Sequence, residues 1–197
     1  GNSSPIISET RPTIIFSEEG NIYVSWEAED SGGTRYLALA WRDITGGTQW
    51  NNVILLQDFS GLGWTHRYYP SVFQLNSSHV GLVYMYDSYS PFFPGTYTYG
   101  RVGCYIRPDD LSGSWTSMPV YFNDRTYFQA HDVDIIRLHD DDGDGNHSFA
   151  IAMSAVYTRS AKADTDVWVV VCDDDSNFNW TGANPHQATT SYDDEMF

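Results

Sequence analysis

The chain has 197 residues, of which 41% are hydrophobic and 16% aromatic, and its formal net charge at pH 7 is −16. The aromatic content excludes a disordered acidic tail, because such chains lack the residues that build a core. With only ten Lys and Arg residues and no basic stripe, the chain is not expected to bind nucleic acid or an anionic membrane surface. No apolar run approaches the roughly 20 residues of a transmembrane helix, so membrane insertion is not expected either.

Short apolar strands recur along the chain in groups of four, separated by turns rich in Gly, Asp, Asn and Ser. The first group comprises 12–16, 21–27, 36–42 and 53–57. The second comprises 70–74, 79–86, 101–107 and 118–122, and the third comprises 132–138, 147–157, 166–172 and a weaker stretch near 185. Because no segment shows sustained helical periodicity, we predict an all-β fold of antiparallel sheets.

The three groups are internal repeats, each marked by a tryptophan after its third strand. Trp50, Trp115 and Trp180 follow one another at intervals of 65 residues, and each ends a turn-rich segment. Four antiparallel strands in a unit of this size are typical of a propeller blade, which must stack on other blades to bury both faces. The repeats therefore predict a β-propeller segment with three four-stranded antiparallel blades.

The predicted boundaries follow from these repeats. The three blades are expected over 10–66, 67–129 and 130–186. Partial strands flank them, with 1–9 as the outer strand of a preceding blade and 187–197 as the start of a further blade. Three blades do not close a ring of the usual four to eight. We therefore expect a fragment of a larger propeller, and the alternative is self-association of chains through open blade edges.

The first repeat reads RPTIIFSEEGNIYVSWEAED, followed by YLALAWRDITGGTQW. These segments resemble the repeats of sialidase-like, BNR-type β-propellers, whose Asp-box turn has the pattern Ser-x-Asp-x-Gly-x-x-Trp. Gly47 and Trp50 match that pattern, while Asp43 and Thr45 stand in for its Ser and Asp. The resemblance implies an extracellular or cell-surface module with a binding or structural role, and a glycan or surface protein as partner. The alternatives are a fragment of a sialidase-type glycoside hydrolase and a structural subunit of a surface layer or filament.

An acidic loop in the third repeat carries alternating oxygen ligands for a hard cation such as Ca²⁺. The candidate ligands are Asp140, Asp142, Asp144, Asn146 and Ser148. An EF-hand is excluded because its twelfth position is Ile151, inside an apolar strand. The loop resembles the calcium loops of FG-GAP, integrin-type propellers, in which a strand follows directly. We predict a structural Ca²⁺ site, and the alternative is a plain acidic turn.

The topology of a propeller indicates where a ligand would bind. First strands line the central channel, and the residues that enter them lie near one mouth. The candidate ligand-binding residues there are Arg11, Trp64, Tyr69, His131 and Asp132. Aromatic and guanidinium groups of this kind suit sugar rings and their hydroxyls. The alternative is that these aromatic residues pack between the blades.

Catalysis is not expected from these residues alone. Sialidases use an arginine cluster that binds the substrate carboxylate, a Tyr-Glu nucleophile pair and an Asp that acts as the acid. Arg11, before Pro12, lies roughly where the first of those arginines belongs, and Asp132 is a weak candidate for a catalytic carboxylate. Glycoside hydrolysis needs two carboxylates across one cleft, and the sequence identifies no partner for Asp132.

Two minor features remain. Cys104 and Cys172 each lie in an apolar strand, so two buried thiols are expected, with a disulfide between them as the alternative. Four N-glycosylation sequons suggest a glycoprotein, and the one at Asn76 lies in a predicted turn.

Overall fold

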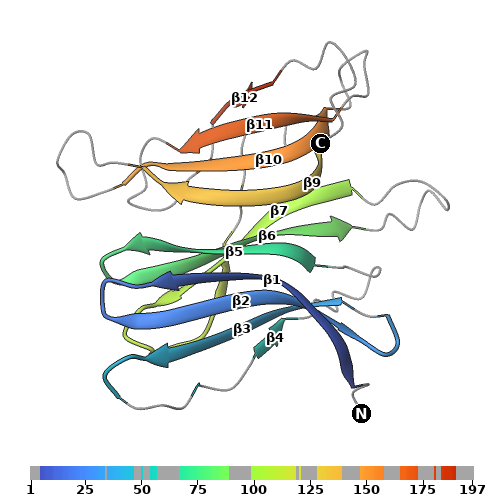
Figure 1. The fold of residues 1–197 in the computed structure, drawn as a ribbon. Helices are drawn as coiled ribbons and strands as arrows, with labels where there is room; N and C mark the ends of the chain where they lie inside the picture. Colours follow the sequence, from blue (N-terminus) through green and yellow to red (C-terminus); the bar gives the residue numbers. More distant parts are fainter. Residues whose placement is uncertain are drawn as a thin grey trace.

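The computed structural model describes residues 5–33, 35–46, 50, 54–56, 67–88, 99–118, 120, 128–138, 147–157, 165–172, 180 and 183–189. These residues form three antiparallel four-stranded sheets, which confirms the predicted all-β class (Figure 1). The described part of the chain contains no helix long and apolar enough to cross a membrane.

The strands follow the chain in order within each sheet. The first sheet consists of β1 (Ile6–Phe16), β2 (Asn21–Asp30), β3 (Arg35–Asp43) and β4 (Ile54–Leu56). The second consists of β5 (Arg67–Asn76), β6 (His79–Ser88), β7 (Tyr99–Pro108) and β8 (Thr116–Met118). The third consists of β9 (Phe128–Arg137), β10 (Phe149–Tyr157), β11 (Thr165–Cys172) and β12 (Pro185–Gln187).

Each of the twelve strands overlaps or adjoins a predicted one. One stretch differs from the prediction. Residues 6–9, expected as a strand of a preceding blade, continue β1 instead and pair with β2, with Ile6 opposite Asp30.

The second sheet lies between the other two, in green between the blue first sheet and the orange third sheet of Figure 1. Its side chains are buried on both faces, in keeping with the period-two alternation of a strand. Leu82 and Tyr84 of β6 pack toward the first sheet, whereas Val83 and Met85 belong to the cluster shared with the third sheet.

The interface between the first and second sheets combines an apolar layer with two buried charged residues. Leu37 and Leu39 of β3 pack there against the second sheet. Arg107 is 1% exposed, lies 4.2 Å from the Trp41 ring centroid, and donates to the Leu111 carbonyl at 2.8 Å. Asp109 is fully buried and accepts hydrogen bonds from side chains of the first sheet. The turn after β7 thereby connects the second sheet to the first through hydrogen bonds.

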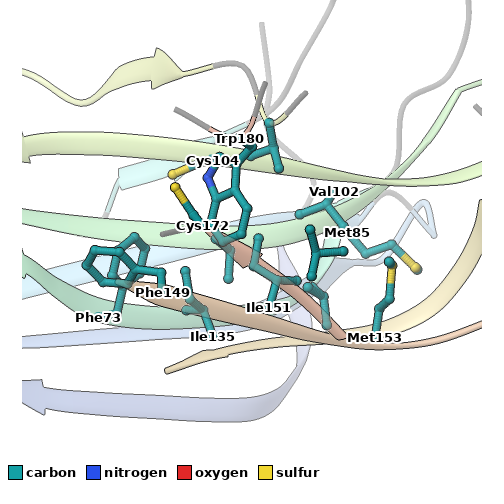
Figure 2. Packing of buried hydrophobic residues seen from close by; sticks show 14 of the residues in the cluster. Phe73, Met85, Val102, Cys104, Ile135, Phe149, Ile151, Met153, Cys172 and Trp180 are labelled. Atoms are coloured by element: carbon teal, nitrogen blue, oxygen red, sulfur yellow. The ribbon is translucent and has the colours of Figure 1, made fainter. Parts of the chain in front are cut away.

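The interface between the second and third sheets is the larger apolar cluster (Figure 2). Phe73 and Phe149 meet edge to face, with ring centroids 5.4 Å apart. Cys104 and Cys172 are both buried in this cluster as free thiols, which confirms the expected pair of buried thiols. Trp180 is 1% exposed and packs in the same cluster.

Equivalent residues in the first strands of the three repeats do not all pack in the same direction along the stack. Ile15 and Phe73 occupy equivalent places in β1 and β5, and each packs toward the next sheet along the chain. Ile135, at the equivalent place in β9, packs back against the second sheet, in the same cluster as Phe73. A propeller in which every sheet presents the same face forward is therefore not confirmed. The sheets do not close on one another in the described part of the chain.

Both outer faces of the stack carry exposed apolar side chains. Ile14 and Phe16 of β1 are 61% and 65% exposed on the outer face of the first sheet. Ile136 of β9 is 62% exposed and Val167 of β11 is 39% exposed on the outer face of the third. Phe16 and Ile136 are equivalent positions of two repeats, so the same face of the repeat is left open at both ends.

Candidate ligand site at the bulged first strands

The first strand of each sheet is interrupted at the same place by a register shift. The shifts lie between Thr10 and Thr13 in β1, between Tyr68 and Ser71 in β5, and next to residue 131 in β9. Arg11 and Tyr69, within the first two bulges, both have a φ of 54°, which is rare for residues other than glycine. Bulges and backbone strain of this kind are concentrated at binding sites.

Side chains from these bulges and from β2 meet around Arg11. The Arg11 Nη1 donates to Glu27 Oε2 at 2.9 Å, and the guanidinium carbon lies 4.1 Å from the centroid of the Tyr69 ring. The Glu27 side chain is 7% exposed and that of Arg11 is 47% exposed. We call Arg11, Glu27, Tyr69 and Asp132 the bulge cluster.

The charges of the cluster act together on Arg11, with Asp132 making the smallest contribution. Partial burial lowers the pKa of Arg11, but the hydrogen bond and charge of Glu27, with smaller effects of Tyr69 and Asp132, leave that pKa above its ordinary value. Asp132 is exposed, and its Oδ1 accepts a hydrogen bond from the Val133 amide at 2.8 Å. The cluster therefore presents a charged guanidinium and a carboxylate together.

The structure thus brings together two of the five predicted ligand-binding residues, Arg11 and Tyr69. Asp132 is exposed on β9 and contributes a smaller charge effect on Arg11. His131 lies in β9 at the third bulge, but its side chain is outside the described residues, and so is the whole of Trp64. Whether these two residues belong to the site stays a prediction.

Glu27 is the member of the cluster that the sequence reasoning missed. The sequence places it in a strand that matches a family pattern and indicates no role of its own. The available signal is the alternation of β2, in which Tyr23, Ser25 and Glu27 share the buried face of the strand. A carboxylate at an inward position needs a partner, because an unpaired buried charge is costly.

The predicted metal ligands Asp140, Asp142, Asp144 and Asn146 lie outside the described residues. Ser148, the fifth, follows that loop just before β10, and its carbonyl accepts a hydrogen bond from the Leu138 amide at 2.8 Å. Within the described parts of the chain, no group of three or more His, Cys, Asp or Glu side chains could hold a metal ion. The calcium site stays a prediction.

The Asp-box-like turns are similar in two repeats. Asp43 Oδ1 accepts from the amide and hydroxyl of Thr45, and Asp110 Oδ1 accepts in the same way from Ser112. These contacts are local turn geometry, which makes the turns structural rather than part of a site.

No family model matches the chain, and no curated protein matches it.

Proposed function

We propose that the chain is an extracellular or cell-surface carbohydrate-binding module built from sialidase-like β-propeller repeats, and that the bulge cluster holds its ligand. The observation that carries the proposal is the contact of Arg11 with Tyr69, which come from equivalent bulges in two repeats, beside the nearly buried Glu27. The packing of the second sheet onto the first supports the propeller part, since both repeats present the same face forward.

The chemistry of the cluster fits sugars. A sugar hydroxyl both donates and accepts hydrogen bonds, and the cluster offers guanidinium donors at Arg11 and a carboxylate acceptor at Asp132. The Tyr69 ring adds an apolar surface of the kind that packs on sugar rings.

Binding to immobilised glycans tests this function. Arg11→Ala and Tyr69→Leu should each weaken glycan binding at least tenfold, because each removes a group of the cluster. Arg137→Ala is the matched control, since Arg137 pairs with Glu18 at the far end of β9 from Asp132. Equal binding by all three variants, or no binding by the wild type across a broad panel, would contradict the proposal.

A sialidase-type glycoside hydrolase is the second candidate. The observation that favours it is Glu27, because it gives the bulge cluster a second carboxylate, and hydrolysis of a glycosidic bond needs two. This candidate predicts turnover of a fluorogenic sialoside or another glycoside, with a strong loss in Asp132→Asn. Absence of turnover across such a panel removes it.

A calcium ion bound by Asp140, Asp142, Asp144, Asn146 and Ser148 is part of the main proposal. The described residues on either side of the loop support it, because β9 and β10 pair antiparallel there and the Leu138 amide donates to the Ser148 carbonyl at 2.8 Å. Bound Ca²⁺ would neutralise carboxylates that repel one another, which stabilises the folded chain.

A structural subunit that self-associates is the third candidate. The exposed Ile14, Phe16 and Ile136 on the two outer faces favour it, since exposed apolar patches mark interaction surfaces. It predicts oligomers whose mass rises with concentration in light scattering. A monomer at all concentrations contradicts it.

A further inference from the structure

The charges of the bulge cluster constrain which sugars it can accept. Arg11 supplies one positive charge, whereas Glu27 and Asp132 supply two negative charges, so the cluster is formally negative. The whole chain adds a field of the same sign, with a net charge of −16. Fields of this kind lower the local concentration of anions and oppose their binding.

Arg11 is already engaged on two sides. Its Nη1 donates to Glu27 Oε2, and one face of its guanidinium is covered by the Tyr69 ring. A sugar carboxylate would have to compete with Glu27, which is nearly buried, for the same positive charge. Weakening that pair is unfavourable, because a buried carboxylate depends on its partners for compensation.

The exposed part of the cluster remains suited to hydroxyl groups. Nearly half of the Arg11 side chain is exposed, so part of the guanidinium can reach a ligand, and the Asp132 carboxylate, whose charge acts on Arg11, is also exposed. A neutral sugar can accept from Arg11 through one hydroxyl and donate to Asp132 through another. A sugar acid would bring a further negative charge to a cluster that is already negative, and like charges repel.

We infer that the bulge cluster selects neutral sugars and rejects sugar acids, with Glu27 and Asp132 as the residues that determine this specificity. The inference deepens the proposed function and rests on it. Glu27 acts by neutralising Arg11, with which it shares a hydrogen bond, and Asp132 acts through its negative charge. Selectivity of this kind arises from unfavourable interactions with the wrong ligand as much as from contacts with the right one.

Matched glycan pairs test the inference. Oligosaccharides ending in galactose or glucose are compared with those ending in galacturonate or glucuronate, which differ only by a carboxylate, and N-acetylneuraminate is included as a third acid. At pH 7 and low salt, the wild type should bind the neutral member of a pair at least tenfold more tightly. Higher salt should narrow the difference, because it screens exposed charges.

Two variants separate specificity from simple loss of the site. Glu27→Gln frees the charge of Arg11 and should improve binding of the acid member at least fivefold. Asp132→Asn acts at an exposed position, where folding is not at risk, and should change the preference in the same direction. Arg137→Ala should leave the ratio unchanged, and melting temperatures show whether each variant is folded.

The outcomes separate this inference from the proposed function. Tighter binding of an acid by the wild type, with loss in Arg11→Ala, overturns the inference and retains a carbohydrate site. An unchanged ratio in both Glu27→Gln and Asp132→Asn also overturns it. If no member of any pair binds, the proposed function fails, and the inference fails with it.

Discussion

Gly81 occupies a position that no larger residue can fill without moving the interface between the second and third sheets. It lies opposite Phe73 in the β5–β6 pair, and the Phe73 ring covers it. An added Cβ would lie far closer to the ring atoms Cζ and Cε1 than the contact distance of about 3.5 Å between carbons. The ring cannot turn aside freely, because Phe73 is 4% exposed and packs against Phe149.

The cost of Gly81→Ala follows from this geometry. Overpacking a core costs about 1–3 kcal/mol, and we expect about 3 kcal/mol because the ring is held from both sheets. For a chain of this size, that loss lowers the melting temperature by roughly 6–12 °C. Urea and thermal unfolding, followed by tryptophan fluorescence, measure both quantities.

Two further variants identify the cause. Gly33 has a φ of +80°, and a Cβ added there would have no atom within 4 Å. Gly33→Ala should therefore lower the free energy of unfolding by only about 1 kcal/mol, through backbone strain. Phe73→Leu should make room, so that Gly81→Ala costs less in that background than alone. A loss below about 0.5 kcal/mol for Gly81→Ala, or simple additivity in the double variant, would refute the reasoning.

Three other predictions follow from the structure. Burial, followed by the charge and hydrogen bond of Asp109, raises the pKa of the Tyr23 phenol above its ordinary value of 10.0. The neutral phenol therefore contributes its full stabilisation below pH 10, and this stabilisation declines as the pH rises above 10. Tyr23→Phe should cost about 1 kcal/mol at pH 7 and flatten that alkaline decline in urea unfolding at pH 8–11, and an equally steep decline would contradict this. Arg107→Lys should lose about 2 kcal/mol, because lysine can neither stack on Trp41 in the same way nor reproduce the planar donor geometry; an unchanged urea midpoint would show that the stacking contributes little. Chelation of Ca²⁺ should lower the melting temperature of the wild type, and Asp142→Ala should abolish that shift, whereas a melt unaffected by chelation rules the calcium site out.

The strands could be predicted because their pattern is local. Alternating apolar residues bounded by Gly, Asp and Asn turns define each strand without reference to its neighbours. The equivalence of Arg11 and Tyr69 could also be predicted, since each precedes a proline at the start of an apolar run. Their strained backbone could not, because a register shift depends on the strand opposite.

The orientation of the third sheet could not be predicted, and the reason lies in its composition. β9 has Ile135 on one face and Ile136 on the other, and β11 of the same sheet also carries apolar side chains on both faces. Either face of the third sheet could therefore have been buried against the second sheet, and tertiary packing decides which one is. Glu27 was missed for a related reason, because the partner that explains it, Arg11, lies 16 residues away in another strand.

The strain at the bulges argues for a role beyond stability. Holding Arg11 and Tyr69 at a φ of 54° costs about 1–3 kcal/mol each, and a glycine would avoid most of that cost. The contacts of their side chains contribute only modest stabilisation. A cation–π contact contributes about 0.5–2 kcal/mol, and an ion pair with a guanidinium exposed to this extent contributes about 1 kcal/mol at most. These interactions offset only the lower end of the strain, so the two bulges add little net stability. What they do provide is an arginine held over a tyrosine ring and hydrogen-bonded to a carboxylate, an arrangement that suits a binding site.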